Sequence, residues 1–185
     1  MTDKSTRVCP VEKAGSLDTR IRRWFQNPRR ILSPFIREGM TAVDLGCGPG
    51  FFTLAMALLA GRSGRVIAVD LQEGMLEKVR EKITGTELEE RITLHKCGQE
   101  TIGLDEKVDF LLAFYLIHEV PDEEGLFREI SSLLKPGGMM LIVEPPFHVS
   151  ETAFKKTLDS AEKAGLRLLR RPKMFLQKTA VMEKC

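Results

Sequence analysis

Hydrophobic and polar positions along the chain divide it into short apolar runs and longer amphipathic segments that follow one another. The apolar runs have the length and composition of β-strands, and the segments between them have the spacing of helices. The predicted strands are Thr41–Leu45, Val66–Val69, Ile92–His95, Val108–Phe114 and Met139–Val143, followed by two closing strands at Arg167–Leu169 and Thr179–Met182. This alternation predicts an α/β fold: a doubly wound, mostly parallel sheet of seven strands with helices on both faces.

Helix signals mark the segments between these strands. Met75, Val79 and Ile83 recur every four residues, so the segment that starts near Gln72 has one apolar face. We expect further helices at Phe51–Leu59, from Pro121 and Asp122 to a stop at Pro136, and from a capping Ser150 to Gly165. The strand Val108–Phe114 is apolar throughout except for Asp109, which is the pattern of a central strand buried on both faces.

The segment 1–39 forms an N-terminal arm, because the main domain, residues 40–185, needs no further chain to close its sheet. Apolar residues recur in the arm at helical spacing, first as Leu17, Ile21, Trp24 and Phe25, then as Ile31 and Phe35 after a helix start at Asn27–Pro28. We therefore expect a helical arm. Two placements are open: a lid over the acceptor pocket, which would bring Cys9, Arg20 or Arg23 there, or a helix pair docked far from the site.

Composition describes one ordinary globular domain. Of 185 residues, 43% are hydrophobic and 29% charged, and the net charge is +2. The chain has no run of the ~20 apolar residues that span a bilayer, and its four cysteines show no paired spacing, so we expect a cytoplasmic protein with free thiols. Residues 1–37 hold nine Lys or Arg against three Asp or Glu, which suits either an anionic partner or a solvated helix face.

A glycine-rich turn, Asp44–Gly50, joins the first predicted strand to a helix. Glycines there let the backbone approach a ligand closely, and the helix N-terminus offers unpaired N–H groups. The turn differs from the dinucleotide fingerprint in two places: Phe51 stands where its third glycine would be, and Asp44 adds a carboxylate at the strand end. That carboxylate would repel a pyrophosphate and attract the ammonium group of a methionine moiety. Charge complementarity therefore favours S-adenosylmethionine as the cofactor.

A second carboxylate, Asp70, directly follows the predicted strand Val66–Val69. Its two oxygens can hold both hydroxyls of a ribose. The alternative is an N-cap for the helix that starts near Gln72. The combination with the glycine turn favours the ribose role.

The order of these motifs resembles that of class I S-adenosylmethionine-dependent methyltransferases, from about Met40 to the C-terminus. The matching segments are Val43–Gly50 for the nucleotide loop, Val66–Asp70 for the ribose motif, Asp109–Val120 for the fourth strand, and Leu134–Pro145, with its Leu-Lys-Pro-Gly-Gly signature, for the fifth. The resemblance implies a Rossmann-like fold with S-adenosylmethionine as cofactor. It is strongest for the small-molecule branch that resembles ubiquinone, menaquinone and arsenite methyltransferases.

The cofactor-binding residues that this resemblance implies are Asp44, Gly46, Gly48, Gly50, Asp70, Leu71, Met75 and Gln99. Phe114 is added to them because it lies at the carboxyl end of the fourth predicted strand, where ligands collect. The glycines would shape the loop, Asp44 would face the methionine end, Asp70 would hold the ribose, and Leu71 and Met75 would flank the adenine. Relatives often have an Asp after the third strand to accept from the adenine amino group. Gln99 is the candidate here, and it can make this bond through its amide oxygen.

Acceptor-side candidates follow the fourth and fifth predicted strands, because ligands collect outside the carboxyl ends of parallel strands. They are Tyr115, His118 and Glu119 as catalytic residues, and Trp24, Tyr115, Glu144 and His148 as residues of the substrate pocket. His118 or Glu119 can act as a general base; alternatively His118 bonds the backbone and Glu119 caps the next helix. Tyr115 can line the pocket or pack in the core.

Three functions are compatible with these residues. A methyltransferase of a small-molecule acceptor is favoured over an RNA or protein methyltransferase that uses the basic arm, and over a noncatalytic cofactor-binding protein. Enzymes that methylate base amino groups often have an Asn- or Asp-Pro-Pro-Tyr motif after the fourth strand, and Ala113–Leu116 stands there instead. A dehydrogenase is the remaining alternative. No metal site is expected, because His95, Cys97, His118 and His148 lack zinc-finger spacing.

Overall fold

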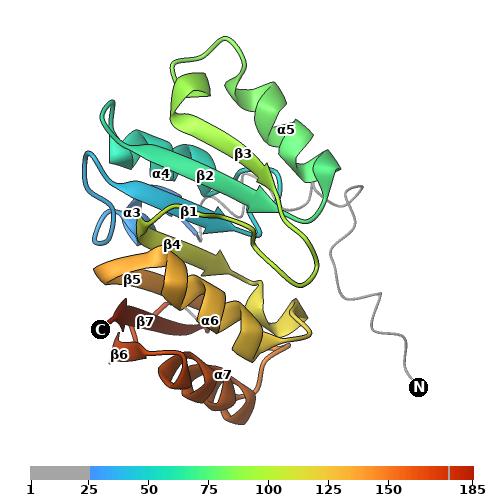
Figure 1. Ribbon diagram of the computed structural model, residues 1–185, viewed down its shortest axis with the longest axis vertical. Coiled ribbons are helices and arrows are strands. Elements are labelled where there is room, and N and C mark those ends of the chain that lie inside the picture. The colour runs from blue at the N-terminus through green and yellow to red at the C-terminus, as the bar shows by residue number, and fades with distance from the viewer. Residues whose placement is uncertain (1–25, 175) are drawn as a thin grey trace.

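The computed structural model describes residues 26–174 and 176–185. Within these residues the chain forms one seven-stranded sheet in the order β3-β2-β1-β4-β5-β7-β6 (Figure 1). The strands are β1 (Thr41–Leu45), β2 (Arg65–Asp70), β3 (Ile92–Lys96), β4 (Val108–Phe114), β5 (Leu134–Glu144), β6 (Leu166–Arg170) and β7 (Lys178–Lys184). Strands β1 to β5 run parallel, and β7 lies antiparallel between β5 and β6. The predicted α/β, mostly parallel sheet is confirmed.

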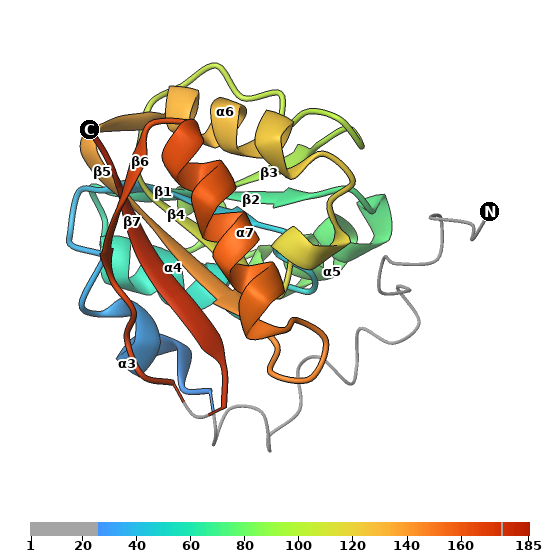
Figure 2. The same cartoon turned by 90° about the horizontal axis from the view of Figure 1, so that it is seen from below.

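Helices cover both faces of this sheet. They are α3 (Pro28–Leu32), α4 (Thr53–Ala60), α5 (Glu73–Ile83), α6 (Glu123–Leu133) and α7 (Glu151–Lys163), with short 3-10 turns η3 (Glu89–Arg91) and η4 (Ile117–Glu119). One buried cluster packs α3, α4 and α5 against one face, and a second packs α6 and α7 against the other (Figure 2). In the described ranges, no helix is both long and apolar enough to cross a bilayer.

The central strand β4 contributes side chains to both buried clusters. Phe110, Leu112 and Phe114 belong to the cluster under α3, α4 and α5, while Leu111 and Ala113 belong to the cluster under α6 and α7. Successive side chains of a strand point to opposite faces, so a strand buried on both faces must be apolar at every position. This is why β4 was recognisable in the sequence.

The strand order reverses between β1 and β4, which are neighbours in the sheet. The chain leaves β1 towards α4 on one face and leaves β4 towards α6 on the other. In doubly wound sheets ligands bind outside the carboxyl ends of the strands at such a reversal. The strand ends that meet at this edge are Leu45, Asp70, Phe114 and Glu144.

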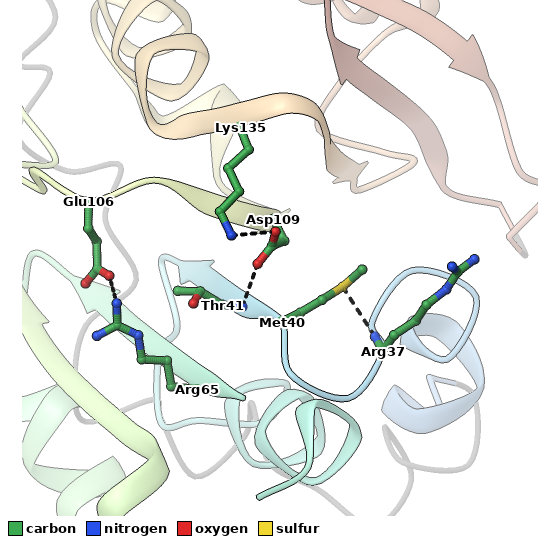
Figure 3. A network of polar contacts seen from close by, with 7 residues as sticks. All are labelled: Arg37, Met40, Thr41, Arg65, Glu106, Asp109 and Lys135. Atoms are coloured by element: carbon green, nitrogen blue, oxygen red, sulfur yellow. Dashed lines mark hydrogen bonds and ion pairs between the residues drawn. The ribbon is translucent and has the colours of Figure 1, made fainter. Parts of the chain in front are cut away.

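The opposite, amino edge of the sheet is fixed by polar contacts (Figure 3). Asp109 accepts a hydrogen bond from the backbone N–H of Thr41 at 2.8 Å and binds the ammonium group of Lys135 at 2.7 Å. Arg65 pairs with Glu106 at the same edge. Asp109, the one polar residue of β4, therefore joins the starts of β1, β4 and β5 far from the carboxyl edge.

The fifth strand begins earlier than the predicted Met139–Val143. Leu134 already pairs with Val108, and the chain then bulges before regular pairing resumes. The preceding helix consequently ends at Leu133, not at Pro136, because Leu134 has extended backbone angles. The residue before a proline is sterically driven out of the helical region, so the helix must end ahead of Lys135.

The other helix boundaries agree more closely with the pattern. Ser150 caps α7 by accepting a hydrogen bond from the N–H of Ala153 at 3.1 Å, and Gly165 follows its end with a φ of 86°. Both signals are confirmed. The helix predicted from Phe51 begins instead at Thr53, because the turn that carries the glycines extends through Phe52.

Only the last part of the N-terminal arm lies within the described residues. Asn27 caps α3 through its side chain and Pro28 occupies its first turn, as predicted. The helix ends at Leu32, so Phe35 does not lie on it as predicted; it is buried in the following turn, where its ring stacks on Phe110 at 5.7 Å. Leu32, Phe35 and Ile36 thus belong to the core of the sheet domain. Leu17, Ile21, Trp24 and Phe25 lie outside the described residues, as do Cys9, Arg20 and Arg23.

Candidate functional site

The glycine turn lies at the carboxyl edge and is tied to the neighbouring strand. The backbone N–H groups of Gly46 and Cys47 donate to the carbonyl of Val69 at 2.8 and 2.9 Å. Gly46 has a φ of 70°, and a side chain there would come within 2.8 Å of Leu116, which follows β4. Gly48 has a φ of 51°, but a Cβ there would meet no atom within 4 Å. The turn therefore needs glycine for its backbone angles, and at Gly48 it faces open space.

Asp70 holds this turn in place. The residue is 7% exposed, and its carboxylate accepts hydrogen bonds from the N–H of Gly48 and the N–H of Gln72, each at 2.9 Å. Burial raises the pKa of Asp70, and the backbone hydrogen bonds oppose that shift. Each carboxylate oxygen can accept a further hydrogen bond. The N-cap alternative is wrong, because Gln72 occupies the N-cap position of α5 and Asp70 bonds the backbone N–H of Gln72, ahead of the helix. The remaining lone pairs of Asp70 suit the hydroxyls of a ribose, and that role stays a prediction.

Asp44 lies on β1 beside the turn and is 2% exposed. The hydroxyl of Thr53, in the first turn of α4, donates to its carboxylate at 2.6 Å. A buried carboxylate keeps its charge only when such donors surround it. Thr53 was missed in the sequence, although it is the one hydroxyl in the apolar run Phe51–Leu59 and follows an aspartate closely.

The residues expected around an adenine differ in their surroundings. Leu71 is half-buried directly after β2, and Met75 is buried on α5. The backbone N–H of Cys97 donates to the carbonyl of Asp70 at 3.1 Å, which brings the segment after β3 to the end of β2. Gln99 is exposed in that segment. Its role towards adenine stays a prediction.

Aromatic rings gather where β4 ends. The ring of Phe114 lies 4.3 Å from that of Phe52 and 4.5 Å from that of Tyr115, measured between centroids. Tyr115 has a φ of 61°, a left-handed conformation that costs energy for a residue with a side chain. Its hydroxyl accepts hydrogen bonds from the amides of Gln26 at 2.9 Å and Gln177 at 2.7 Å.

These two glutamines were missed in the sequence, and no local signal points to them. Gln26 and Gln177 lie 89 and 62 positions from Tyr115 in the chain and in irregular segments. Only the fold brings them together. They place the hydroxyl of Tyr115 at a fixed point beside the carboxyl edge.

Glu144, at the end of β5, holds His118. The Glu144 side chain is 1% exposed, and one oxygen accepts the backbone N–H of Ile117 at 2.9 Å. The other oxygen lies 2.5 Å from Nδ1 of His118, whose side chain is 27% exposed. The predicted residues Glu144 and His118 are therefore brought together by the pairing of β4 and β5.

Glu119 and His148 complete this group. Burial raises the pKa of Glu119; His118 opposes this rise, while Glu144 and Asp70 add to it. The exposed ring of His148 stacks against that of His118 with centroids 6.4 Å apart. Glu119 does not cap α6, because Asp122 does so by accepting the N–H of Gly125. That alternative for Glu119 is therefore wrong. Trp24 lies outside the described residues.

Metal-binding side chains do not converge in the described part of the chain, where no three His, Cys, Asp or Glu side chains are placed to hold one ion. The ring of His95 is engaged with the carbonyl of Ile102 at 2.7 Å. Cys47 is buried, and that burial raises the pKa of its thiol, which disfavours the thiolate that a metal would need.

The polar groups at this carboxyl edge of the sheet fit S-adenosylmethionine. Gly48 opens to space, Asp70 offers carboxylate lone pairs beside it, and Asp44 supplies a negative charge at the end of β1. The ligand has hydroxyls, an ammonium group and a sulfonium, so it complements acceptors and carboxylates. A pyrophosphate would instead meet two aspartates.

Comparison with known proteins also indicates a methyltransferase. A family model described as a methyltransferase domain matches residues 36–181. Demethylmenaquinone methyltransferase from Bacillus cereus is 28% identical over 65% of this chain and 50% of its own length. The corresponding enzyme from Staphylococcus aureus is 33% identical over 59% of this chain and 44% of its own length. The chain spans about half the length of the curated relatives it matches.

Solved structures extend the similarity over nearly the whole chain. A SAM-dependent methyltransferase from Aquifex aeolicus superposes with a TM-score of 0.84 at 26% identity, covering 95% of this chain and 98% of that one. A TehB-like SAM-dependent methyltransferase from Corynebacterium glutamicum has a TM-score of 0.73 at 16% identity, covering 94% and 93%, and so agrees in fold. The family model matches well over half of the residues, and this chain therefore belongs to the methyltransferase-domain family, with the fold and the cofactor of the class I S-adenosylmethionine-dependent methyltransferases.

Proposed function

We propose that this chain transfers a methyl group from S-adenosylmethionine to a small-molecule acceptor. The observation that carries the proposal is that a donor-binding group and an acceptor-side group of residues lie at the same edge of the sheet. The glycine turn and Asp70 form a cradle for the donor, and His118 with Glu144 follows the adjoining strands. Leu116 packs towards Gly46 between them.

The donor side is supported by residues whose chemistry matches the ligand. Asp70 would hold the ribose, Asp44 would face the methionine ammonium group, and Gly48 would allow close approach of the backbone. Gln99 and Met75 would border the adenine. When bound, S-adenosylmethionine supplies an electrophilic methyl group: the acceptor's electron pair forms the new bond to carbon, and the carbon–sulfur pair stays on sulfur.

The acceptor side rests on the residues that follow β4 and β5. Tyr115 would line the pocket, its hydroxyl fixed by two amides, and His148 and Glu144 would border it. His118 is the candidate general base, because it is partly exposed and held by a carboxylate. Glu119 is the second candidate, because burial raises the pKa of its carboxyl group and so makes its carboxylate a stronger base.

A small molecule is favoured as acceptor over RNA or protein. The relatives from Bacillus cereus and Staphylococcus aureus are named for a small molecule, demethylmenaquinone. The cytoplasm is the proposed location, because the chain's cysteines have no paired spacing. An RNA or protein methyltransferase that uses the basic arm is the alternative.

Labelled methyl transfer tests the proposed function. The wild-type chain would be incubated with methyl-labelled S-adenosylmethionine and with separate metabolite, RNA and protein pools. We expect label in the metabolite pool, and much less label with Asp70→Ala at a cofactor concentration that does not saturate it, because this variant lacks the ribose acceptor. Label confined to RNA or protein would refute the small-molecule assignment.

The N-terminal arm, residues 1–39, is proposed to border the acceptor site. The supporting contact is that of Gln26 with Tyr115. Deletion of residues 1–26 removes this contact while leaving α3 and the buried Phe35 in place. A folded product that binds cofactor but has lost methyl transfer would support a lid, and full activity would refute it.

A further inference from the structure

The buried carboxylate of Glu144 has two partners of different kinds. One oxygen accepts the backbone N–H of Ile117 at 2.9 Å, and the other lies 2.5 Å from Nδ1 of His118. A backbone N–H can only donate, so the oxygen facing Ile117 must be an acceptor. We take the second oxygen to be an acceptor as well, with Nδ1 of His118 as the donor.

This arrangement determines the tautomer of His118. In a neutral imidazole one nitrogen carries the hydrogen and the other accepts. With the hydrogen held on Nδ1, Nε2 is the accepting nitrogen. The nearly complete burial of Glu144 strengthens the bond, since a charge-assisted hydrogen bond is stronger in a poorly hydrated environment.

We propose that Glu144 is the positioning residue that fixes His118 as the Nδ1–H tautomer, so that Nε2 takes up a proton from the methyl acceptor. This rests on the proposed function. The acceptor class follows: a group that carries a proton and loses it as it gains the methyl group, such as an acidic O–H, an N–H or the C–H of an electron-rich ring. A thioether or tertiary amine has no such proton and would need no base.

Other titratable groups around His118 do not share this role. Glu119 follows it on η4, Glu123 interacts with it electrostatically from the start of α6, and His148 stacks on its ring from the β5–α7 segment. Glu123 is instead bonded by the hydroxyl of Thr157 at 2.9 Å. Among the described residues, Glu144 is the one whose carboxylate oxygen bonds Nδ1 of His118.

The substitution Glu144→Gln tests the tautomer with almost no change of shape. A glutamine has one oxygen, and the N–H of Ile117 requires it, so the amide NH₂ must face Nδ1 of His118. Nδ1 then has to accept, the hydrogen moves to Nε2, and Nε2 loses its capacity to take up a proton. Glu123→Gln is the matched control, because it removes the same charge from a neighbour that does not bond the ring.

Nitrogen-15 NMR of the free protein determines the tautomer of His118 directly, because protonated and unprotonated imidazole nitrogens have widely separated chemical shifts. The chain has three histidines, and His118→Ala assigns the signals of His118. At pH 8 we expect a protonated Nδ1 and a bare Nε2 in the wild type and in Glu123→Gln, and the reverse in Glu144→Gln. A protonated Nε2 in the wild type, or an unchanged tautomer in Glu144→Gln, would overturn the proposal.

Kinetics with the acceptor found by labelled transfer separates this inference from the function on which it rests. Glu144→Gln should lower kcat by on the order of 100-fold or more, the usual contribution of a general base, with little change in cofactor affinity. An identified acceptor whose methylated atom carried no proton would overturn the class assignment and leave methyl transfer intact. Absence of all transfer, with the tautomer as expected, would instead refute the proposed function.

Discussion

Gly48→Ala separates what the glycine turn does for the fold from what it does for the ligand. Gly48 has a φ of 51°, and a Cβ there would meet no protein atom within 4 Å. The fold therefore loses only the cost of a left-handed residue with a side chain, about 1–2 kcal/mol. For a chain of this size that corresponds to a fall in Tm of roughly 2–8 °C.

The effect on the ligand should be larger. The new methyl group enters open space at a residue whose backbone N–H is bonded by Asp70 at 2.9 Å. If the cofactor occupies that space, the methyl group forces the ligand away from the backbone. We expect S-adenosylmethionine affinity to fall by about tenfold or more, which is at least ~1.4 kcal/mol.

Gly85→Ala is the matched control. Gly85 has a φ of 72°, and a Cβ there also meets nothing within 4 Å, but it lies in the turn between α5 and η3. Unfolding of both variants and calorimetric titration with S-adenosylmethionine make the comparison. Similar losses of stability with a loss of affinity in Gly48→Ala alone support the reasoning. Equal affinities in the two variants would refute it.

Three further changes probe the same edge. Asp70→Ala should weaken S-adenosylmethionine binding by about tenfold to a hundredfold in calorimetry, because the ribose loses charged acceptors; unchanged affinity would remove Asp70 from the site. Thr53→Val should cost about 1.5–3 kcal/mol in chemical unfolding, since the buried carboxylate of Asp44 loses a donor at 2.6 Å, whereas Thr53→Ser should retain most of the stability. Burial raises the pKa of Glu119, so its protonated form favours the folded state, and this contribution is lost as the pH rises through the folded-state pKa. Urea unfolding should therefore show wild-type stability falling relative to Glu119→Gln from mildly acidic to neutral pH, and parallel profiles would contradict the shift.

The strands could be predicted where burial on both faces imposes a continuous apolar run. The limits of β1 and β4 agree with the pattern, and two of them have a visible signal: Gly46 follows the last residue of β1, and Lys107 precedes the first residue of β4. The glycine turn was equally visible, since positive φ angles favour glycine. The start of β5 was not, because Leu134 joins the strand through pairing across a bulge that leaves no hydrophobic pattern.

The candidate site was predictable in its residues and not in its bonds. His118 and Glu144 were each singled out by their positions after neighbouring strands, but their contact depends on the register of β4 and β5. The link from Asp70 to Gly48 depends in the same way on the pairing of β1 and β2. Gln177 reaches Tyr115 from a segment without any periodic signal, so only the tertiary structure could reveal it.

Calorimetric titration of the wild-type chain with S-adenosylmethionine, alongside NAD, tests the central claim most directly. The cradle of Asp44, Gly48 and Asp70 predicts one-to-one binding of S-adenosylmethionine in the micromolar range and much weaker binding of NAD, whose pyrophosphate would meet both carboxylates. Absence of S-adenosylmethionine binding, or tighter binding of NAD, would contradict the account.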